Sequence, residues 1–306
     1  MQKFRFLGPR KRLWLGLSLA LTVLALATVI FIRPKLGIEF AGGSELIIVR
    51  TDKPTEATPE ETIAQLFSQL NLELIQNLSL EGGQRLVRTV SLNPEQTKSL
   101  NQAIKPTGLE IVQFTQIEPS ISKEIKQRSL LSLLAASVAI VAYIAYSFRR
   151  LPQGLSSWRF GITAIAALAH DVLITYAAYL WLGQYFNFQL DSLLITALLT
   201  VMGFSVHDTI VVYDRIRERI SHQPRLLETD QFELLAEQAL QETLARSLAT
   251  SLVVIIVLVA LVIFGHIAIR SFVVALLIGI TIGTYSSIAL AAPLLVVWQR
   301  AKRIKS

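Results

Sequence analysis

Apolar residues are gathered into long blocks along this chain and are seldom interleaved with charged ones. Six blocks reach the roughly 20 residues that an α-helix needs to cross about 30 Å of hydrocarbon. They are residues 13–32, 129–148, 160–182, 192–213, 247–265 and 271–298. Four of them contain no charged residue, and the third and fourth each carry one His-Asp pair. The pattern predicts six transmembrane helices.

Composition supports a membrane protein, because 52% of the 306 residues are apolar and 17% are charged, below the quarter that is usual in soluble proteins. The first block follows a basic stretch and contains Ala25-Leu26-Ala27, which is similar to a signal-peptide cleavage site. Cleavage there would leave the apolar residues 28–32 at a new terminus, and the block is longer than a usual signal-peptide core. We therefore expect an uncleaved anchor helix.

Lysine and arginine cluster at one set of block ends. The clusters lie in residues 1–12, 149–159, 215–225 and 300–306, whereas 183–191 has no basic residue and 266–270 has one. Because basic loops stay in the cytoplasm, both termini are predicted to be cytoplasmic, in the bacterial cytoplasmic (inner) membrane or in an internal membrane if the cell has one. The net charge of +7 then reflects topology and anionic membrane lipids and does not indicate nucleic acid.

One segment, residues 33–128, is long and polar enough to form an extracytoplasmic domain. Strand patterns cover 44–51, 72–80, 85–90 and 108–117, with a turn at Glu81-Gly82-Gly83 between the middle two. Helical spacing marks 59–70, and Asn93 is a candidate N-cap for a second helix. This βαββαβ order predicts an α+β ferredoxin-like sandwich. Gly42 and Gly43 are interpreted as turn glycines before the first strand.

The predicted organisation is therefore one span, one soluble domain and five further spans. In order, we expect a cytoplasmic tail (1–12), helix 1 (13–32), the extracytoplasmic domain (33–128), a five-helix membrane domain (129–299) and a basic cytoplasmic tail (300–306). Residues 222–238 are interpreted as an acidic connector, and 234–246 as an amphipathic helix along the cytoplasmic surface.

Ionisable residues inside the spans are the candidate functional residues. Asp171 lies mid-block, and Asp208 lies five residues before the end of its block, about 8 Å below the boundary at 1.5 Å per residue. A carboxylate there needs a partner, water or a proton. Arg246, at the start of the next span, either reaches Asp208 or extends to the lipid headgroups, as basic residues at helix ends usually do. Both carboxylates have structural alternatives as hydrogen-bonding residues between helices. His170 and His207 are either relay members or neutral packing residues.

Four motifs together carry a family resemblance. They are "GIEFAGGSEL" after the first span, "ALAHDVLIT" in the third, "GFSVHDTIVVYDRIRE" in the fourth and "TLARSLATSL" entering the fifth. From end to end the chain resembles the SecF family, the smaller membrane subunit of the SecD–SecF accessory complex of the protein-export translocase. Ala41 and His207 depart from the family pattern, which usually has threonine and often asparagine at these places.

The resemblance implies half of an RND-like transporter, driven by the proton or sodium gradient, that promotes late steps of translocation and release of the exported chain. Asp208 and Arg246 match the family's ion-conducting residues, and Asp171 falls in a motif of less defined role. The remaining motif residues are assigned to structure: Gly42, Gly43, Thr209, Asp214 and Arg215. The implied partners are a SecD-like subunit, the SecYEG translocon, a YajC-like subunit, SecA indirectly, the exported unfolded polypeptide and membrane lipids.

The sequence also allows a comparison with enzymes, small-molecule transporters and scaffold proteins. The two His-Asp dipeptides are similar to those of metal-dependent HD phosphohydrolases, but further ligands in a wet context are missing. A di-aspartyl protease built from Asp171 and Asp208 is disfavoured by their different expected depths. An ion-coupled small-molecule transporter half and a non-conducting scaffold stay open. No nucleophile, phosphate loop or cysteine occurs, so we expect no enzyme activity, cofactor or metal.

Overall fold

The computed structural model describes residues 6–8, 10–51, 58–149, 156–221 and 229–301. Two compact units are present. One contains residues 36–130 together with 190–192, and the other contains the rest of the described chain. Parts of the expected tails 1–12 and 300–306, and of the connector 222–238, lie outside the described residues.

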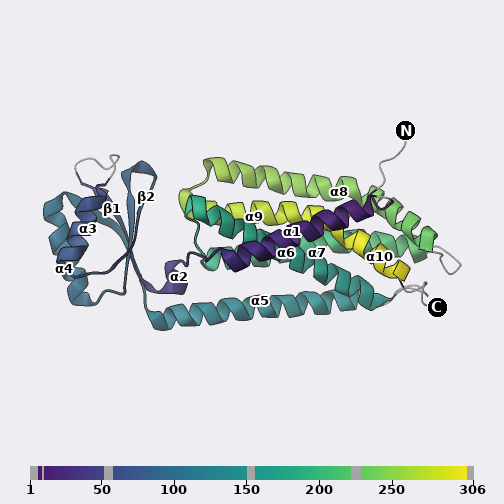
Figure 1. Cartoon of the computed structure of the whole chain (residues 1–306), viewed down its shortest axis with the longest axis horizontal. Helices are drawn as coiled ribbons and strands as arrows, with labels where there is room; N and C mark the ends of the chain where they lie inside the picture. The colour runs from purple at the N-terminus through teal and green to yellow at the C-terminus, as the bar shows by residue number, and fades with distance from the viewer. Residues whose placement is uncertain (1–5, 9, 52–57, 150–155, 222–228, 302–306) are drawn as a thin grey trace. The chain divides into compact units, whose positions relative to one another are not determined.

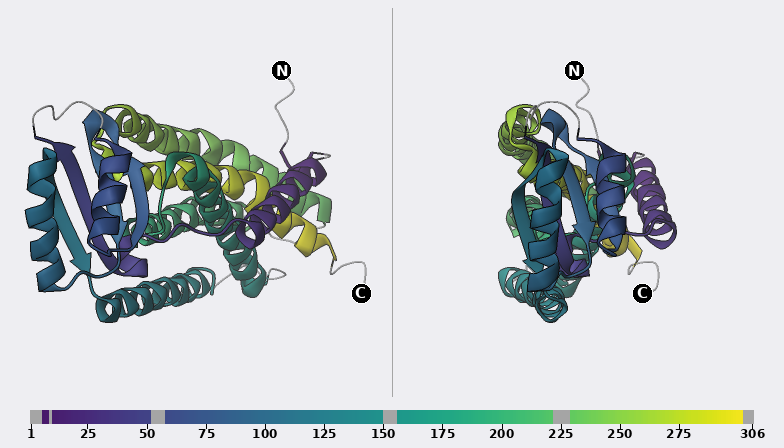
Figure 2. Two further views of the ribbon diagram at one scale, coloured as in Figure 1. Left: turned by 60° about the vertical axis from the view of Figure 1, so that its left-hand side comes forward. Right: turned by 90° about the vertical axis from the view of Figure 1, so that its left-hand side faces the viewer.

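The first of these units is built on one antiparallel sheet. Its strands are β1 (Gly43–Arg50), β2 (Leu74–Ser79), β3 (Arg85–Thr89) and β4 (Leu109–Ile117), in the spatial order β2-β3-β1-β4. Two helices, α3 (Glu60–Gln69) and α4 (Pro94–Ile104), cover one face of the sheet (Figure 2). The alternation of β1 places Leu46 and Ile48 against that helical face, where both are fully buried. The order of elements along the chain is the predicted one.

Local signals set the ends of these elements. The Asn93 side chain accepts from the backbone N–H of Gln96 at 2.7 Å, and the Gln96 side chain accepts from the N–H of Asn93 at 3.0 Å. This capping box begins α4 one residue after the predicted cap. The predicted turn between β2 and β3 is a short 3₁₀ segment, η1 (Glu81–Gly83).

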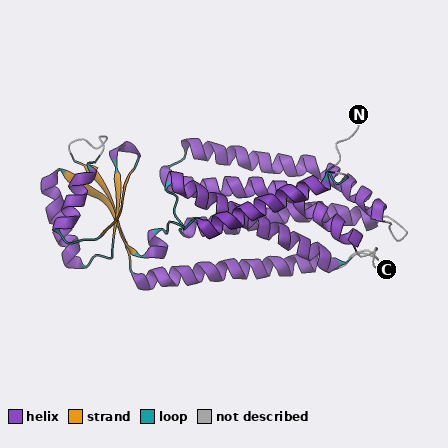
Figure 3. Ribbon diagram, viewed as in Figure 1, coloured by secondary structure: helices purple, strands orange, loops and turns teal. Residues whose placement is uncertain are grey.

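The helical unit contains the long helices. They are α1 (Lys11–Phe31), the greater part of α5 (Pro119–Ser147), α6 (Ser157–Phe186), α7 (Ser192–Ser221), α8 (Thr229–Phe264) and the run of α9 (Ile267–Ser286) with α10 (Ala292–Ala301) (Figure 1). A π-helical turn, Ser287–Ala291, joins α9 to α10. The described part of the chain thus has six helical segments long and apolar enough to span a membrane. Among the described residues, the strands all belong to the unit of residues 36–130 (Figure 3).

Several helices are longer than the apolar blocks that predicted them. α5 begins ten residues before residue 129, and α7 continues to Ser221 instead of ending at residue 213. Residues 234–246, expected as an amphipathic helix, are helical and form the early part of the continuous helix α8. Ala236, Ala239 and Leu240 are buried against the end of α7, so tertiary packing extends the helix beyond its apolar stretch.

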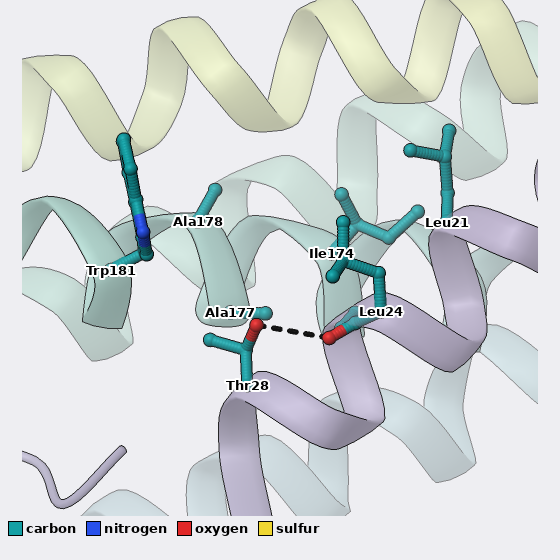
Figure 4. Close-up of a pocket in the computed structure, with 8 residues that line it drawn as sticks. Leu21, Leu24, Thr28, Ile174, Ala177, Ala178 and Trp181 are labelled. Carbon is teal, nitrogen blue, oxygen red and sulfur yellow. Dashed lines mark hydrogen bonds between the residues drawn. The ribbon is translucent and has the colours of Figure 1, made fainter. Parts of the chain in front are cut away.

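Burial separates the inner helices from the outer ones. In the most apolar 18-residue stretch of α6, 56% of the residues are buried, whereas the buried share in the corresponding stretch of α5 is 6%. α1 packs on α6 through Ala25, Ile174 and Ala177. Beside this contact lies an apolar groove of about 290 Å³, lined by both helices and bordered by Trp181 (Figure 4). The inner helices α6 and α7 are therefore the ones that shape the polar interior of the unit.

Candidate functional site

Asp171 lies in the middle of α6 and is fully buried. Its Oδ2 accepts hydrogen bonds from Ser205 Oγ at 2.6 Å and from Ser286 Oγ at 2.5 Å, while its Oδ1 lies 2.8 Å from His170 Nδ1. These partners come from α7, α9 and α6 itself. Asp171 therefore ties three helices together, as a buried carboxylate must if it is not to remain unpaired.

Asp208 is held more sparsely. It is 5% exposed, and its Oδ2 accepts from Ser287 Oγ at 2.5 Å. Within the described chain, Ser287 is the one side chain that donates a hydrogen bond to this carboxylate. Loss of that one contact would leave Asp208 buried without a partner, so Ser287 decides how firmly the carboxylate is held.

The two carboxylates lie at similar depth. Each is near the middle of a 30-residue helix, and their serine donors are consecutive residues. Because α7 continues for two turns beyond the apolar block, Asp208 lies near the middle of the helix, although it lies five residues before the end of the block. The consecutive serine donors hold both carboxylates at similar levels along the helices, so different depths do not argue against a di-aspartyl site. Asp171 is nevertheless closed to a peptide, since it has no exposed surface and three side-chain partners.

The other predicted pathway residues fall into two environments. His170 is buried, and its Nε2 has no hydrogen-bond partner among the described residues. His207 and Arg246 are both exposed on the surface of this chain. No ion pair joins Arg246 to Asp208 within the described ranges. The structure therefore brings His170 to Asp171 and leaves His207 and Arg246 facing outward from this chain.

The motif residues assigned to structure occupy several environments. Thr209 is buried, and its hydroxyl has no partner in the described part of the chain. Asp214 lies 3.6 Å from Arg217, and Arg215 pairs with Glu218 and with Glu242 of α8 at 2.6 Å each. The contact of Arg215 with Glu242 joins the last turns of α7 to α8, and the other two contacts lie within α7.

Backbone geometry accounts for the two motif glycines. Gly42 follows the short helix α2 (Ile38–Ala41) with φ of +76°, and Gly43 has φ of +113°. A Cβ added at Gly43 would lie 2.6 Å from the carbonyl oxygen of Thr89 on β3. Side chains rarely adopt such φ values, so both positions require glycine for the turn that leads into β1.

Sequence reasoning missed four residues of this site. Gly279 and Gly283 of α9 face Val201 and Ser205 of α7, and Ser286 and Ser287 donate to the carboxylates. The available signal was the Gly-x-x-x-Gly spacing at 279–283, which marks close helix contacts in membranes. The block 271–298 contains no charged residue, so its sequence did not indicate its serines as site residues.

The arrangement suits movement of a small cation or proton better than covalent chemistry. No group of three or more histidine, aspartate or glutamate side chains suited to a metal ion occurs in the described ranges. The buried polar atoms are carboxylates, hydroxyls and one imidazole, all able to exchange or relay a proton. They lie in helices of membrane-spanning length, where ionisable residues usually mark ion or substrate pathways.

Comparisons with known proteins agree with this description. Residues 96–301 match the family described as "Protein export membrane protein SecD/SecF, C-terminal". The "Protein translocase subunit SecF" of Thermobaculum terrenum is 39% identical over 277 residues, covering 87% of this chain and 84% of that protein. The SecF of Anaerolinea thermophila is 35% identical, covering 95% of this chain and 92% of that one.

Solved structures show the same relationship. SecDF of Thermus thermophilus, described as a translocon-associated membrane protein, matches with a TM-score of 0.79 and 28% identity over 96% of this chain. SecDF in a super-membrane-facing form matches with a TM-score of 0.68 and 27% identity over the whole of this chain. This chain spans 38% and 40% of those longer chains, respectively. Family match, close relatives and shared fold place the chain in the SecD/SecF protein-export family, as a SecF subunit of the translocase accessory complex.

Proposed function

We propose that this subunit works with a SecD-like partner to use the proton or sodium gradient in late steps of protein translocation and in release of the exported chain. The observation that carries the proposal is the sparsely held carboxylate of Asp208 inside a membrane-spanning helix. An ion carrier must gain and lose its cargo without disrupting the fold. A carboxylate with one hydroxyl partner meets that need, because a hydroxyl can donate to the charged form and accept from the protonated form.

The other residues take supporting roles in this proposal. Asp171 and His170 form a second polar site, in which the buried Nε2 of His170 has no hydrogen-bond partner among the described residues. His207 and Arg246 are exposed on spans of this chain, and charged groups in a bilayer face protein or water and not lipid. Their outward position supports a SecD-like half that packs over them and meets Arg246 with a carboxylate or another acceptor.

We assign the finer features of architecture and location in the same way. The basic-residue asymmetry supports cytoplasmic termini and an extracytoplasmic domain, in the cytoplasmic membrane or an internal one. The β2-β3-β1-β4 order with antiparallel neighbours supports a ferredoxin-like sandwich. SecYEG, a YajC-like subunit, SecA indirectly, the unfolded exported polypeptide and lipids are the contacts that this role requires.

The decisive experiment measures export into inverted vesicles with and without an imposed gradient. Asp208→Asn keeps the volume but cannot change charge, so we expect gradient stimulation to be lost while assembly with SecD persists. Asp208→Glu should keep part of the stimulation. The Arg246→Lys variant should show reduced gradient stimulation, because an ammonium cannot reproduce the planar bidentate contact of a guanidinium.

A matched control is available on the same chain. Asp230 is exposed at the start of α8, so Asp230→Asn should keep full stimulation. Full stimulation in the Asp208→Asn vesicles would refute ion carriage by this residue and would favour a non-conducting scaffold.

For topology, a reporter fused near Thr89 should be active only outside the cytoplasm, and a reporter fused at the C-terminus should be active only inside it. Activity of both reporters in the same compartment would contradict the six-span arrangement.

A further inference from the structure

Two consecutive serines reach the two intramembrane carboxylates. Ser286 is the last residue of α9 and donates to Asp171 of α6 at 2.5 Å. Ser287 is the first residue of the π turn and donates to Asp208 of α7 at 2.5 Å. Both serines are fully buried. Since neighbouring residues of a helix point about 100° apart, one residue step is enough to turn from one flanking helix to the other.

Each serine has a second acceptor within reach. Ser286 Oγ lies 3.1 Å from the carbonyl oxygen of Gly283, and Ser287 Oγ lies 3.0 Å from that of Thr284. A hydroxyl carries one hydrogen and two lone pairs. It can therefore donate to a charged carboxylate, or it can donate to the carbonyl and accept from a protonated carboxyl. Each Oγ lies closer to its carboxylate, at 2.5 Å, than to its carbonyl, at 3.1 Å for Ser286 and 3.0 Å for Ser287. A change between the two states therefore moves the oxygen as well as the hydrogen.

The backbone around the serines is held close to α7. A Cβ added at Gly283 would lie 3.1 Å from Ser205 Cβ and 3.7 Å from Asp171 Oδ2. After the serines, Tyr213 Oη of α7 lies 3.0 Å from the carbonyl oxygen of Ala291, the last residue of the π turn. The segment between these contacts is short and has an irregular hydrogen-bond ladder, as π turns at functional sites often do.

We propose that Ser286 and Ser287 are positioning residues that couple Asp171 to Asp208 through the single peptide unit between them. A change in hydrogen bonding at Asp208 turns Ser287, and the shared backbone carries that turn to Ser286 and so to Asp171. The coupling rests on the proposed ion carriage for its biological meaning, but its physical basis is the pair of contacts alone. Asp208 has one protein donor and responds first, whereas Asp171 is steadied by Ser205 and His170.

The coupling can be measured spectroscopically in the full chain, co-expressed with its SecD subunit and reconstituted in lipid vesicles. The infrared difference spectrum between the unchanged chain and the Asp171→Asn variant identifies the carboxyl band of Asp171, which is the band that the variant lacks. We expect Asp208→Asn to shift this band. The shift should disappear when Ser287→Ala is already present, because the path between the carboxylates is then cut.

Export activity supplies a second readout. Loss of a hydrogen bond to a charged group changes an equilibrium constant about tenfold or more. Ser287→Ala should therefore reduce gradient stimulation about tenfold, and Ser287→Thr, which keeps the hydroxyl, should restore part of it. Thr281 is the control, because it lies exposed on the same helix and its hydroxyl bonds only its own turn at Leu277; Thr281→Ala should change neither readout.

The outcomes separate the coupling from the proposed function. An Asp171 band that does not respond to Asp208→Asn would overturn the coupling, whatever the export result. A band that responds equally with and without Ser287→Ala would also overturn it, since another route would then carry the effect. If the band responds through Ser287 but Asp208→Asn keeps full gradient stimulation, the coupling stands and ion carriage by Asp208 fails.

Discussion

The contact between α7 and α9 gives a sharp test of how the site is assembled. A Cβ added at Gly279 would lie 2.2 Å from Val201 Cγ2, 2.7 Å from Cγ1 and 3.0 Å from Cβ. Carbon atoms in contact prefer about 3.5–4.0 Å, so Gly279→Ala brings the helices into overlap. Val201 is fully buried and its branched side chain has one preferred rotamer in a helix. The helices must therefore separate.

The magnitude follows from two opposing effects. Overpacking costs about 1–3 kcal/mol, and three overlapping atoms place this case near the upper end. Replacing glycine by alanine inside a helix contributes about 1 kcal/mol in favour of folding. We expect Gly279→Ala to lower the free energy of unfolding by about 2 kcal/mol. Gly203→Ala on α7 is the control, because nothing lies within 4 Å of its added Cβ, and it should be neutral or slightly stabilising.

The assay is reversible denaturation of the purified full chain in mixed micelles, with Val201→Ala as the compensating change. Val201→Ala alone opens a cavity, and the methyl group of alanine at position 279 then fills part of it. The double variant should be more stable than the sum of the single effects by about 1.5 kcal/mol or more, the coupling expected of residues in contact. If Gly279→Ala resembles Gly203→Ala, or if the two changes simply add, the close packing of α7 on α9 is refuted.

Three further predictions concern contacts outside this interface. Asn93→Ala should destabilise α4 by about 1 kcal/mol through loss of the capping box, seen as faster amide exchange in that helix, whereas Asn93→Asp should preserve protection. Glu237 accepts the backbone N–H of Leu7 at 2.6 Å, so Glu237→Ala should raise amide exchange at Leu7 about tenfold, and unchanged exchange would contradict the contact. Arg88 pairs with Glu45 across β1 and β3, and both side chains are largely buried; Arg88→Ala should lower the melting temperature of the sheet unit more than Arg88→Lys.

The periodic parts of this fold could be read from the sequence. Six apolar blocks predicted the six helices long enough to span a membrane. Alternation predicted the four strands, and helical spacing and the Asn93 cap predicted the two helices, in the right order. The Asn93 cap was also predictable, because its partner lies three residues away. These features depend on contacts that are local or that repeat with the period of the element.

The features that could not be predicted from the sequence depend on contacts between segments that are distant along the chain. α7 runs past residue 213, where Arg215 and Arg219 pair with Glu242 of α8, so Asp208 lies near the middle of the helix and not near its end. The serine donors to the carboxylates come from a block without any charge, 79 residues beyond Asp208 in one case. No periodicity of the sequence joins those positions; only the crossing of α7 and α9 does.

The π turn also fixes the phase of the last helix. Beyond it, Gln299 Oε1 accepts from Arg159 Nη1 at 2.8 Å, and the rings of Trp158 and Trp298 meet edge to face at 5.0 Å. Deleting one residue from Ser287–Ala291 while the turn becomes a regular α-helix would leave α10 nearly in place, because a π turn holds one residue more than an α turn. A regular α-helix that kept all five residues would rotate α10 by about 100° and shift it by about 1.5 Å relative to α9. Both contacts would then point elsewhere, although no residue that makes them had changed. The directions of Trp298 and Gln299 are therefore set by the wide turn at Ser287–Ala291, which precedes them in the chain, and not by those two residues alone.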